Sequence, residues 1–298
     1  MTGTLPLEVA LLPFLQSLSL HYNEFTGIIP VEYAQMRHLV NLDIHGNQLS
    51  GSIPNELYEN DILEQINIGE NHLTGTISAL VGQLTSLKGF HVDHNQFKGS
   101  IPEEIGKLRY LTHTRWDNNH FVGSIPTSIG QLTSVLELWL QGNALTGNIP
   151  SQLAALQELG DLQLFENRLN GVIPEELYTM LNLRRLELSS NDLSGTISTR
   201  IGQLLELKDF RVARNALTGT IPSQLSYLTN LRIVWLHMNK FEGEVPQAIC
   251  NIVGEGFLQY LNADCGPEHN PANPCACCTG CCDRTTEICL LTSLSTSN

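Results

Sequence analysis

Residues 183–198 read LRRLELSSNDLSGTIS, and this stretch carries the pattern that decides the fold. Leu186 and Leu188 alternate with charged neighbours, as in a strand that buries one face. The order LxxLxLxxNxLxGxIP returns along the chain at a fixed distance. Its asparagine recurs every 24 residues in ten copies, at Asn23, Asn47, Asn71, Asn95, Asn119, Asn143, Asn167, Asn191, Asn215 and Asn239. Chance does not produce such spacing, so the chain is built from repeats.

A 24-residue period with these leucines predicts a leucine-rich-repeat solenoid of the α/β type. We expect a right-handed superhelix or horseshoe with a concave parallel β-sheet, mostly strand, with short 3-10 or helical turns. The ten asparagines should form a buried ladder, because a side-chain amide can satisfy both N–H and C=O groups of a buried turn. A glycine follows each asparagine by four residues, where close contact between coils or an unusual backbone conformation would exclude a Cβ. Ile-Pro or Val-Pro follows in eight copies, and Ser78 and Ser198 replace the proline in the other two.

Composition excludes several classes of partner. The chain has 298 residues, with 16 Lys+Arg against 30 Asp+Glu and a formal net charge of -14. We therefore expect neither a nucleic acid nor an anionic membrane surface as the main partner. No apolar stretch approaches the ~20 residues of a membrane span. The hydrophobic share of 42 % is enough to build a core.

The two ends differ from the repeats. We predict a solenoid over residues 1–249, made of a partial first repeat and ten full ones, and a cysteine-rich C-terminal cap over residues 250–298. The first repeat lacks its strand and asparagine, so we expect that an N-terminal cap and any targeting segment are missing. Residues 258–265, LQYLNADC, are predicted to form an eleventh, modified strand. The prolines that follow, Pro267, Pro271 and Pro274, should prevent further regular coils.

All cysteines lie in the predicted cap: Cys250, Cys265, Cys275, Cys277, Cys278, Cys281, Cys282 and Cys289. Eight cysteines fit four disulfides, which would imply an oxidising compartment. Cys278 and Cys281 also have the spacing of a zinc-binding CxxC pair, so a metal is the alternative. The chain has no Asn-x-Ser/Thr acceptor, so N-glycosylation gives an extracellular location no support.

The LxGxIP signature resembles the plant-specific class of leucine-rich repeats found in receptor-kinase ectodomains and polygalacturonase-inhibiting proteins. With the AIC, LxxLxADC and CxCCxxCC order of its tail, the chain most resembles the leucine-rich-repeat families of diatoms and related algae. These resemblances imply a secreted or cell-surface recognition protein.

A ligand should contact the variable positions of the strands, which the repeat leaves free. Trp139, Phe165 and Trp235 are large rings at positions predicted to point into solvent, where aromatic residues anchor interfaces. Basic residues gather on three adjacent coils, which polarises the face. Trp116 replaces an inward leucine and should lie in the core. The candidate ligand-binding residues are Trp139, Phe165, Trp235, Arg184, Arg185, Lys208, Arg211, Arg214, Arg232, Arg115 and His91.

Six of the ten histidines fall on this face, and His91, Asp93 and Asp117 together could bind a metal or sense acid pH. Ordinary exposed histidines are the favoured explanation, because no metal-ligand spacing is distinctive, so we assign no metal site and no cofactor. Phosphate loops, GxSxG elbows and HExxH motifs do not occur, and we predict no enzymatic activity.

We therefore predict a recognition module, extracellular or at the cell surface, that binds a protein, peptide or polysaccharide. Two alternatives stay open: an inhibitor of cell-wall or polysaccharide hydrolases, and an adhesive or matrix protein.

Overall fold

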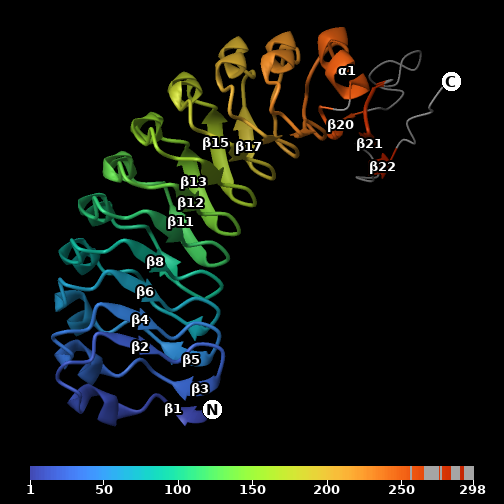
Figure 1. Ribbon diagram of the computed structural model, residues 1–298. Coiled ribbons are helices and arrows are strands. Elements are labelled where there is room, and N and C mark those ends of the chain that lie inside the picture. The colour runs from blue at the N-terminus through green and yellow to red at the C-terminus, as the bar shows by residue number, and fades with distance from the viewer. Residues whose placement is uncertain (256, 265–274, 276, 283–288, 292–298) are drawn as a thin grey trace. The chain divides into compact units, whose positions relative to one another are not determined.

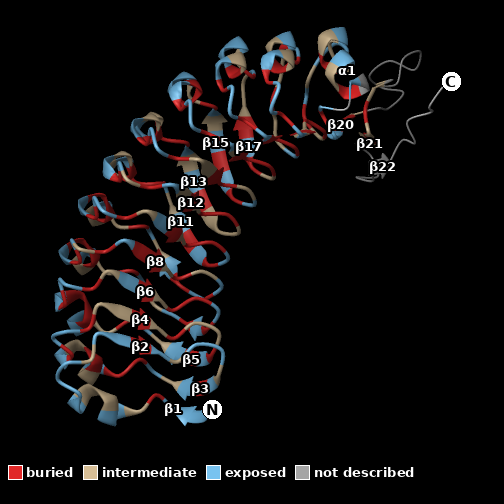
Figure 2. Cartoon of the chain, viewed as in Figure 1, coloured by how far each residue is buried: buried red, intermediate tan, exposed pale blue. Residues whose placement is uncertain are grey.

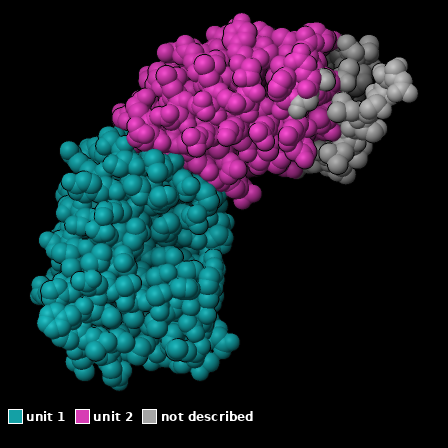
Figure 3. All heavy atoms as spheres, viewed as in Figure 1, with its two compact units in different colours: residues 1–146 teal, residues 147–298 magenta. Residues whose placement is uncertain are grey.

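The structure is a computed structural model that describes residues 1–255, 257–264, 275, 277–282 and 289–291 (Figure 1). The chain divides into residues 1–146 and residues 147–298, which we call unit 1 and unit 2 (Figure 3). Both units are built from the predicted coils, each with a strand, a turn at the asparagine and a short helix. The division between solenoid and cap at residue 250 stays a prediction.

The first strands of the coils in unit 1 pair in parallel, in the order β2-β4-β6-β8-β10-β12. Their bounds are β2 (Ser17–Ser19), β4 (Asn41–Asp43), β6 (Gln65–Asn67), β8 (Gly89–His91), β10 (His113–Arg115) and β12 (Glu137–Trp139). The second strands are β1 (Thr2–Thr4), β3 (Glu24–Gly27), β5 (Gln48–Gly51), β7 (His72–Leu73), β9 (Lys98–Gly99), β11 (His120–Gly123) and β13 (Ala144–Asn148). The 3-10 helices are η1 (Leu7–Leu11), η2 (Val31–Gln35), η3 (Asn55–Glu59), η4 (Ala79–Gln83), η5 (Glu103–Lys107) and η6 (Thr127–Gln131).

Unit 2 repeats the scheme, with parallel pairing in the order β14-β16-β18-β19-β20-β21. These strands are β14 (Asp161–Gln163), β16 (Arg185–Glu187), β18 (Asp209–Arg211), β19 (Ile233–Trp235), β20 (Tyr260–Asp264) and β21 (Gly280–Cys282). The second strands are β15 (Arg168–Val172) and β17 (Asp192–Ser194). The helices are η7 (Ser151–Ala155), η8 (Glu175–Thr179), η9 (Thr199–Gln203), η10 (Ser223–Tyr227) and α1 (Gln247–Gly254).

The 24-residue period sets the strand register, because paired residues on the first strands of neighbouring repeats are 24 positions apart. Arg115 pairs with Trp139 and Arg211 with Trp235, each partner exactly one repeat further along the chain. Residues of one sequence column therefore lie side by side on neighbouring strands, about 4.8 Å apart. The apolar positions of the repeat turn to the other side and are buried, as for Leu186, Leu188 and Leu193. Buried stretches recur from coil to coil (Figure 2). Trp116, predicted to be core, is 2 % exposed, which confirms that prediction.

The asparagine amides connect neighbouring coils. Asn71 Nδ2 donates to the carbonyl oxygens of Ile68 and Gly69 in its own coil and of Ile44 in the preceding coil. Its Oδ1 accepts from the N–H of Leu49, also in the preceding coil, at 2.9 Å. Seven of the ten asparagines are buried, and Asn23, Asn143 and Asn215 are half-buried.

Local contacts explain the glycine that follows each asparagine and the serines that replace proline in two copies. Gly51 has a φ of +77°, a backbone conformation that favours glycine. A Cβ there would also lie 2.9 Å from Ile28 Cγ2 of the preceding coil, so the backbone conformation and the close contact both exclude a side chain. Where serine replaces proline, its hydroxyl caps the helix that follows: Ser78 Oγ accepts from Leu80 N–H and Ser198 Oγ from Arg200 N–H. In these two copies the serine side chain thus satisfies a backbone N–H at the start of the helix, which a proline side chain cannot do.

The C-terminal part departs from the repeat. The predicted eleventh strand forms as β20, with Leu261 buried and Asn262 paired with Trp235, while Cys265 lies outside the described residues. Parallel β21 and antiparallel β22 (Cys289–Leu291), which the sequence pattern did not predict, extend the sheet. Pro267, Pro271 and Pro274 also lie outside the described residues.

Disulfides hold this region together. Cys250 of α1 is bonded to Cys277, and Cys275 is bonded to Cys278. Cys281 and Cys282 are disulfide-bonded as well, and none of the described cysteines is free. The structure therefore favours disulfides over a zinc site at Cys278 and Cys281. Within the described ranges, no helix has the length and apolar character that a membrane crossing requires.

Candidate ligand-binding site

A hollow of about 360 Å³ lies on the strand face of unit 2, within the usual size range of ligand pockets. Five predicted residues line it: Phe165, Arg185, Arg211, Arg214 and Trp235. Seven further residues, which were not predicted from the sequence, also line it: Gln163, Glu166, Glu187, Ser189, Ser190, Ala213 and His237. The register brings the lining residues together: strands β14, β16, β18 and β19 supply five of the twelve, and the turns directly after these strands supply the other seven.

Two arginines are held in the wall of the hollow by buried carboxylates. Arg211 Nε lies 2.8 Å from Asp209 Oδ1 and 3.3 Å from Glu187 Oε2. Arg185 Nε lies 3.3 Å from Asp209 Oδ2, and its Nη1 lies 3.6 Å from Asp161 Oδ2. Asp209 and Glu187 are only 5 % and 4 % exposed. These ion pairs hold both guanidinium groups in place. Removing an arginine would leave a buried carboxylate with one partner fewer, which is costly.

Trp235 forms the floor of the same network. The guanidinium carbon of Arg211 lies 4.1 Å from the centre of the Trp235 ring, which is the geometry of a cation–π contact. The tryptophan was predicted to point freely into solvent, but it is half-buried because Arg211 covers it. The signal was present in the sequence, since an arginine precedes a tryptophan by one repeat in the same column.

Burial controls the charge of Glu187. Desolvation raises the pKa of its carboxyl to about 7, while the hydrogen bond from the Ser189 N–H and the charge of Arg211 act in the opposite direction. The carboxyl therefore changes charge near neutral pH, and the net charge of the hollow becomes more positive as the pH falls.

His237 lines the hollow, and its Nδ1 is closed to solvent. The residue is 8 % exposed, and its buried Nδ1 has no hydrogen-bond partner. Burial lowers the pKa of its imidazole, so the ring is neutral at pH 7. A buried polar atom without a partner is costly, and a bound ligand could satisfy it.

Three predicted basic residues lie elsewhere. Arg184, Lys208 and Arg232 are exposed, stand directly before β16, β18 and β19, and do not line the hollow. Their backbones form a continuous column, since Lys208 N–H donates to Arg184 O and Arg232 N–H donates to Lys208 O, both at 2.8 Å. They give unit 2 an exposed basic column.

The remaining predicted residues belong to unit 1. Arg115 covers Trp139 at 4.4 Å, so this tryptophan is also half-buried rather than free in solvent. Burial, followed by the charge of Arg115, lowers the pKa of His91 to about 4. His91 is therefore neutral at physiological pH and does not titrate in the range where an acid sensor would act.

Several other variable positions are less exposed than the repeat suggests. They were predicted to face solvent, yet their side chains shield one another across closely spaced strands. Those that are buried are Asp117, Gln141, Gln163, Glu187, Ser189, Ala213 and His237.

Comparisons with known proteins agree with the fold. The family model described as Leucine Rich Repeat matches residues 14–36, 38–60, 86–108 and 182–204. No curated protein sequence matches the chain. Among solved structures, the chain is similar to the plant peptide hormone receptor RGFR1 in complex with RGF2. The identity is 37 % and the TM-score 0.83, over 88 % of this chain and 41 % of the receptor.

Two further structures are similar. The Arabidopsis receptor kinase HAESA, solved with the peptide hormone IDA and the co-receptor SERK1, is 31 % identical with a TM-score of 0.80, over 98 % of this chain and 46 % of that one. A leucine-rich-repeat protein of Leptospira interrogans is 32 % identical with a TM-score of 0.70, over 84 % and 61 %. The chain thus spans less than half of each plant receptor chain. Its fold is a leucine-rich-repeat solenoid.

Proposed function

For a leucine-rich-repeat solenoid similar to plant peptide receptors, we propose a non-enzymatic recognition function in which unit 2 binds a peptide in the hollow beside Trp235. The observation that carries the proposal is the hollow itself, in which Arg211 covers Trp235 and Phe165 lines the same space. RGFR1 and HAESA were each solved with a peptide hormone, which supports a peptide as the ligand class.

The mechanism is preorganisation. Arg211 is fixed by Asp209, Glu187 and Trp235 before any ligand arrives, so binding costs little side-chain entropy. Phe165 and Trp235 offer apolar contacts. His237 would offer a hydrogen bond to a peptide amide after its ring turns, because Nδ1 is closed to solvent in the free chain. The exposed column of Arg184, Lys208 and Arg232 would attract an acidic peptide and orient it during encounter.

The finer features of the sequence interpretation belong to the same proposal. The disulfides support an oxidising compartment, and hence a secreted or cell-surface protein. Residues 250–298 would act as a cysteine-rich cap of the kind found in the diatom and algal families. Within unit 1, Arg115, Trp139 and His91 would supply ligand contacts of their own.

A synthetic peptide array probed with the full chain tests the proposal, followed by calorimetry on the best peptide. Trp235→Ala should weaken its binding by tenfold or more, since a central aromatic anchor contributes about 2 kcal/mol or more. Tyr227→Ala is the matched control, because Tyr227 is a large exposed ring on η10, outside the hollow, and should leave affinity unchanged. Equal affinity of the Trp235 variant and wild type would refute the site.

His237→Phe separates binding from folding. Phenylalanine keeps the ring beside Trp235, at 6.2 Å between centroids, but removes the unpartnered nitrogen. The free protein should be as stable as wild type or more stable, while peptide affinity falls. Unchanged turnover of polysaccharide hydrolases, and a monomer in light scattering, would distinguish this function from an inhibitor and from a matrix protein.

A further inference from the structure

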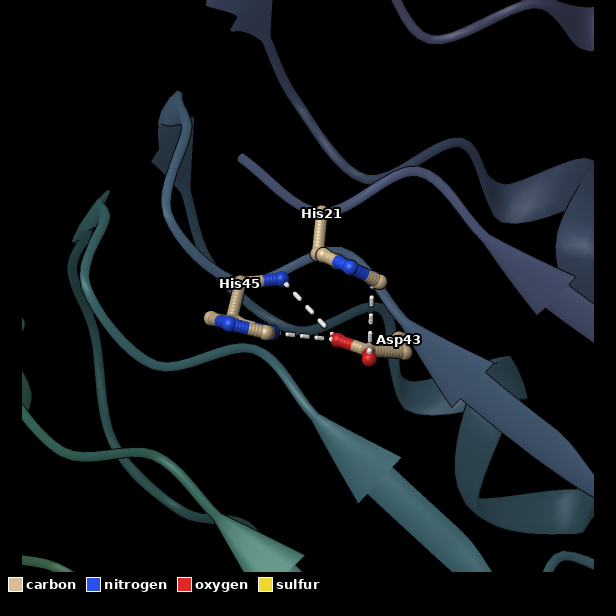
Figure 4. A group of neighbouring side chains, drawn as sticks. All are labelled: His21, Asp43 and His45. Carbon is tan, nitrogen blue, oxygen red and sulfur yellow. Dashed lines mark hydrogen bonds and ion pairs between the residues drawn. The ribbon is translucent and has the colours of Figure 1, made fainter. Parts of the chain in front are cut away.

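A cluster of metal-ligating side chains lies in unit 1, outside the hollow described above. His21 follows β2, Asp43 ends β4, and His45 follows β4 (Figure 4). Their ligand atoms all lie within 4.8 Å of one another, and among the described residues no other group of three such side chains does so. The structure therefore does not assemble the group of His91, Asp93 and Asp117 considered from the sequence.

The register produces this cluster. His21 and His45 are 24 residues apart and so occupy the same position in neighbouring coils. Asp43 precedes His45 by two residues, which places both on one face of the strand. Asp43 Oδ2 lies 3.2 Å from His21 Nδ1, and Asp43 Oδ1 lies 2.6 Å from His45 Nδ1. One carboxylate thus bridges imidazoles from two coils.

Neighbouring groups hold the two rings in place. The imidazoles of His21 and His45 are stacked, with centroids 5.0 Å apart and an interplanar angle of 12°. The Tyr22 ring meets His45 edge-on at 4.5 Å. A Cβ at position 46 would lie 2.5 Å from the Tyr22 ring, so Gly46 is what allows this ring to pack here. The histidine orientations are therefore fixed before a ligand binds.

Hydrogen bonding alone does not satisfy His45. Its Nδ1 lies 2.6 Å from Asp43 Oδ1 and 2.9 Å from Asn67 Nδ2. An imidazole nitrogen carries either a proton or a lone pair, so it can donate to the carboxylate or accept from the amide, but not both. A cation bound at the Nδ1 lone pair and at the carboxylate would take the place of the Asn67 contact.

We propose that His21, Asp43 and His45 bind a divalent transition-metal ion of the Zn²⁺ type. Two imidazoles and one carboxylate are a common ligand set for zinc, whereas Ca²⁺ and Mg²⁺ require oxygen ligands. Ser19 Oγ lies 2.7 Å from His21 Nδ1 and Asn67 Nδ2 lies 2.9 Å from His45 Nδ1, so an ion bound at these nitrogens would replace both contacts. Three protein ligands leave one position of a tetrahedral site open, and the His21 side chain is 44 % exposed, so the ion remains accessible from solvent. The bound ion would join two neighbouring coils.

Calorimetric titration of the full chain with Zn²⁺ tests the site, with disulfides intact and any free thiols alkylated. We expect one Zn²⁺ per chain and no saturable binding of Mg²⁺ or Ca²⁺. Asp43→Asn and His45→Gln should each weaken Zn²⁺ binding by about tenfold or more. His94→Gln is the matched control, because His94 also faces carboxylate oxygens, at 3.2 Å from Asp93 and 3.8 Å from Asp117, but brings only one imidazole to them.

Melting curves recorded by circular dichroism in EDTA, where no metal is bound, show whether a variant has lost stability as well as Zn²⁺ binding. If His45→Gln lowers the melting temperature in EDTA, His21→Gln provides the same test with a more exposed ring. Loss of binding in the cluster variants but not in His94→Gln would support the site. Absence of saturable Zn²⁺ binding, or wild-type affinity in a His21→Gln/His45→Gln double variant, would overturn it.

Discussion

Arg211 and Trp235 are register partners on adjacent strands, and the guanidinium carbon lies 4.1 Å from the centre of the indole ring. Arg115 and Trp139 repeat the relationship in unit 1 at 4.4 Å. The two pairs differ in charge balance. Arg211 also faces the buried carboxylates of Glu187 and Asp209, whereas no carboxylate of the described chain lies within ion-pair distance of Arg115.

This difference predicts unequal costs for the same substitution. Arg115→Ala should reduce the free energy of unfolding by about 0.5–2 kcal/mol, the value of the cation–π contact. Arg211→Ala should cost about 3 kcal/mol or more, because it also leaves two carboxylates buried without this partner. Urea unfolding followed by circular dichroism measures both. Equal losses would show that Arg211 does not stabilise these carboxylates.

The buried asparagine amides that connect neighbouring coils, which we call rungs, predict a second difference in stability between two variants. Asn71→Ala should cost about 2–4 kcal/mol, because the N–H of Leu49 and the carbonyl of Ile44 then lose a buried partner. Asn182→Ala is the control: Asn182 is exposed, its amide donates only to Gln157 O, and its loss should change stability by about 0.5 kcal/mol or less. Similar urea midpoints for the two variants would contradict a stabilising role of the rung.

The disulfide between Cys250 and Cys277 closes a separation of 27 residues and ties α1 to the strand region that follows. Cys250→Ala with Cys277→Ala should cost about 3–4 kcal/mol by chain entropy, and the amides of α1 should exchange hydrogen faster. Cys275→Ala with Cys278→Ala, at a separation of 3 residues, should cost about 2 kcal/mol and leave α1 protected. Unchanged hydrogen exchange of the α1 amides in the Cys250→Ala/Cys277→Ala variant would show that this disulfide does not hold α1 in place.

The repeat made the strand register predictable from sequence, because one period fixes which residues lie side by side. The inward Trp116 and the strand at β20 followed from the same pattern. Strands β21 and β22 could not be predicted, since the pattern stops before them.

The site was only partly predictable. The period places Arg211 beside Trp235, yet that they stack, and that Glu187 becomes buried, depends on how long side chains lean across strands. The metal-ligating cluster had a visible signal, His21 and His45 one repeat apart with Asp43 two residues before His45. Several histidines share this face, so only the distances show which of them meet.

Glu187 predicts how stability depends on pH. Its pKa is about 7 in the folded chain against 4.5 for an unperturbed carboxyl, so between these values the unfolded chain loses a proton that the folded chain keeps. The free energy of unfolding should therefore fall as the pH rises from 4.5 to 7, by up to about 3 kcal/mol. Glu187→Gln should remove this slope. His91, whose pKa is lowered to about 4, acts with the opposite sign, since protonation of the unfolded chain below pH 6.5 destabilises the fold. Melting curves from pH 4 to 8 for wild type, Glu187→Gln and His91→Gln separate the two groups, and an unchanged slope in Glu187→Gln would show that the carboxyl is ionised throughout.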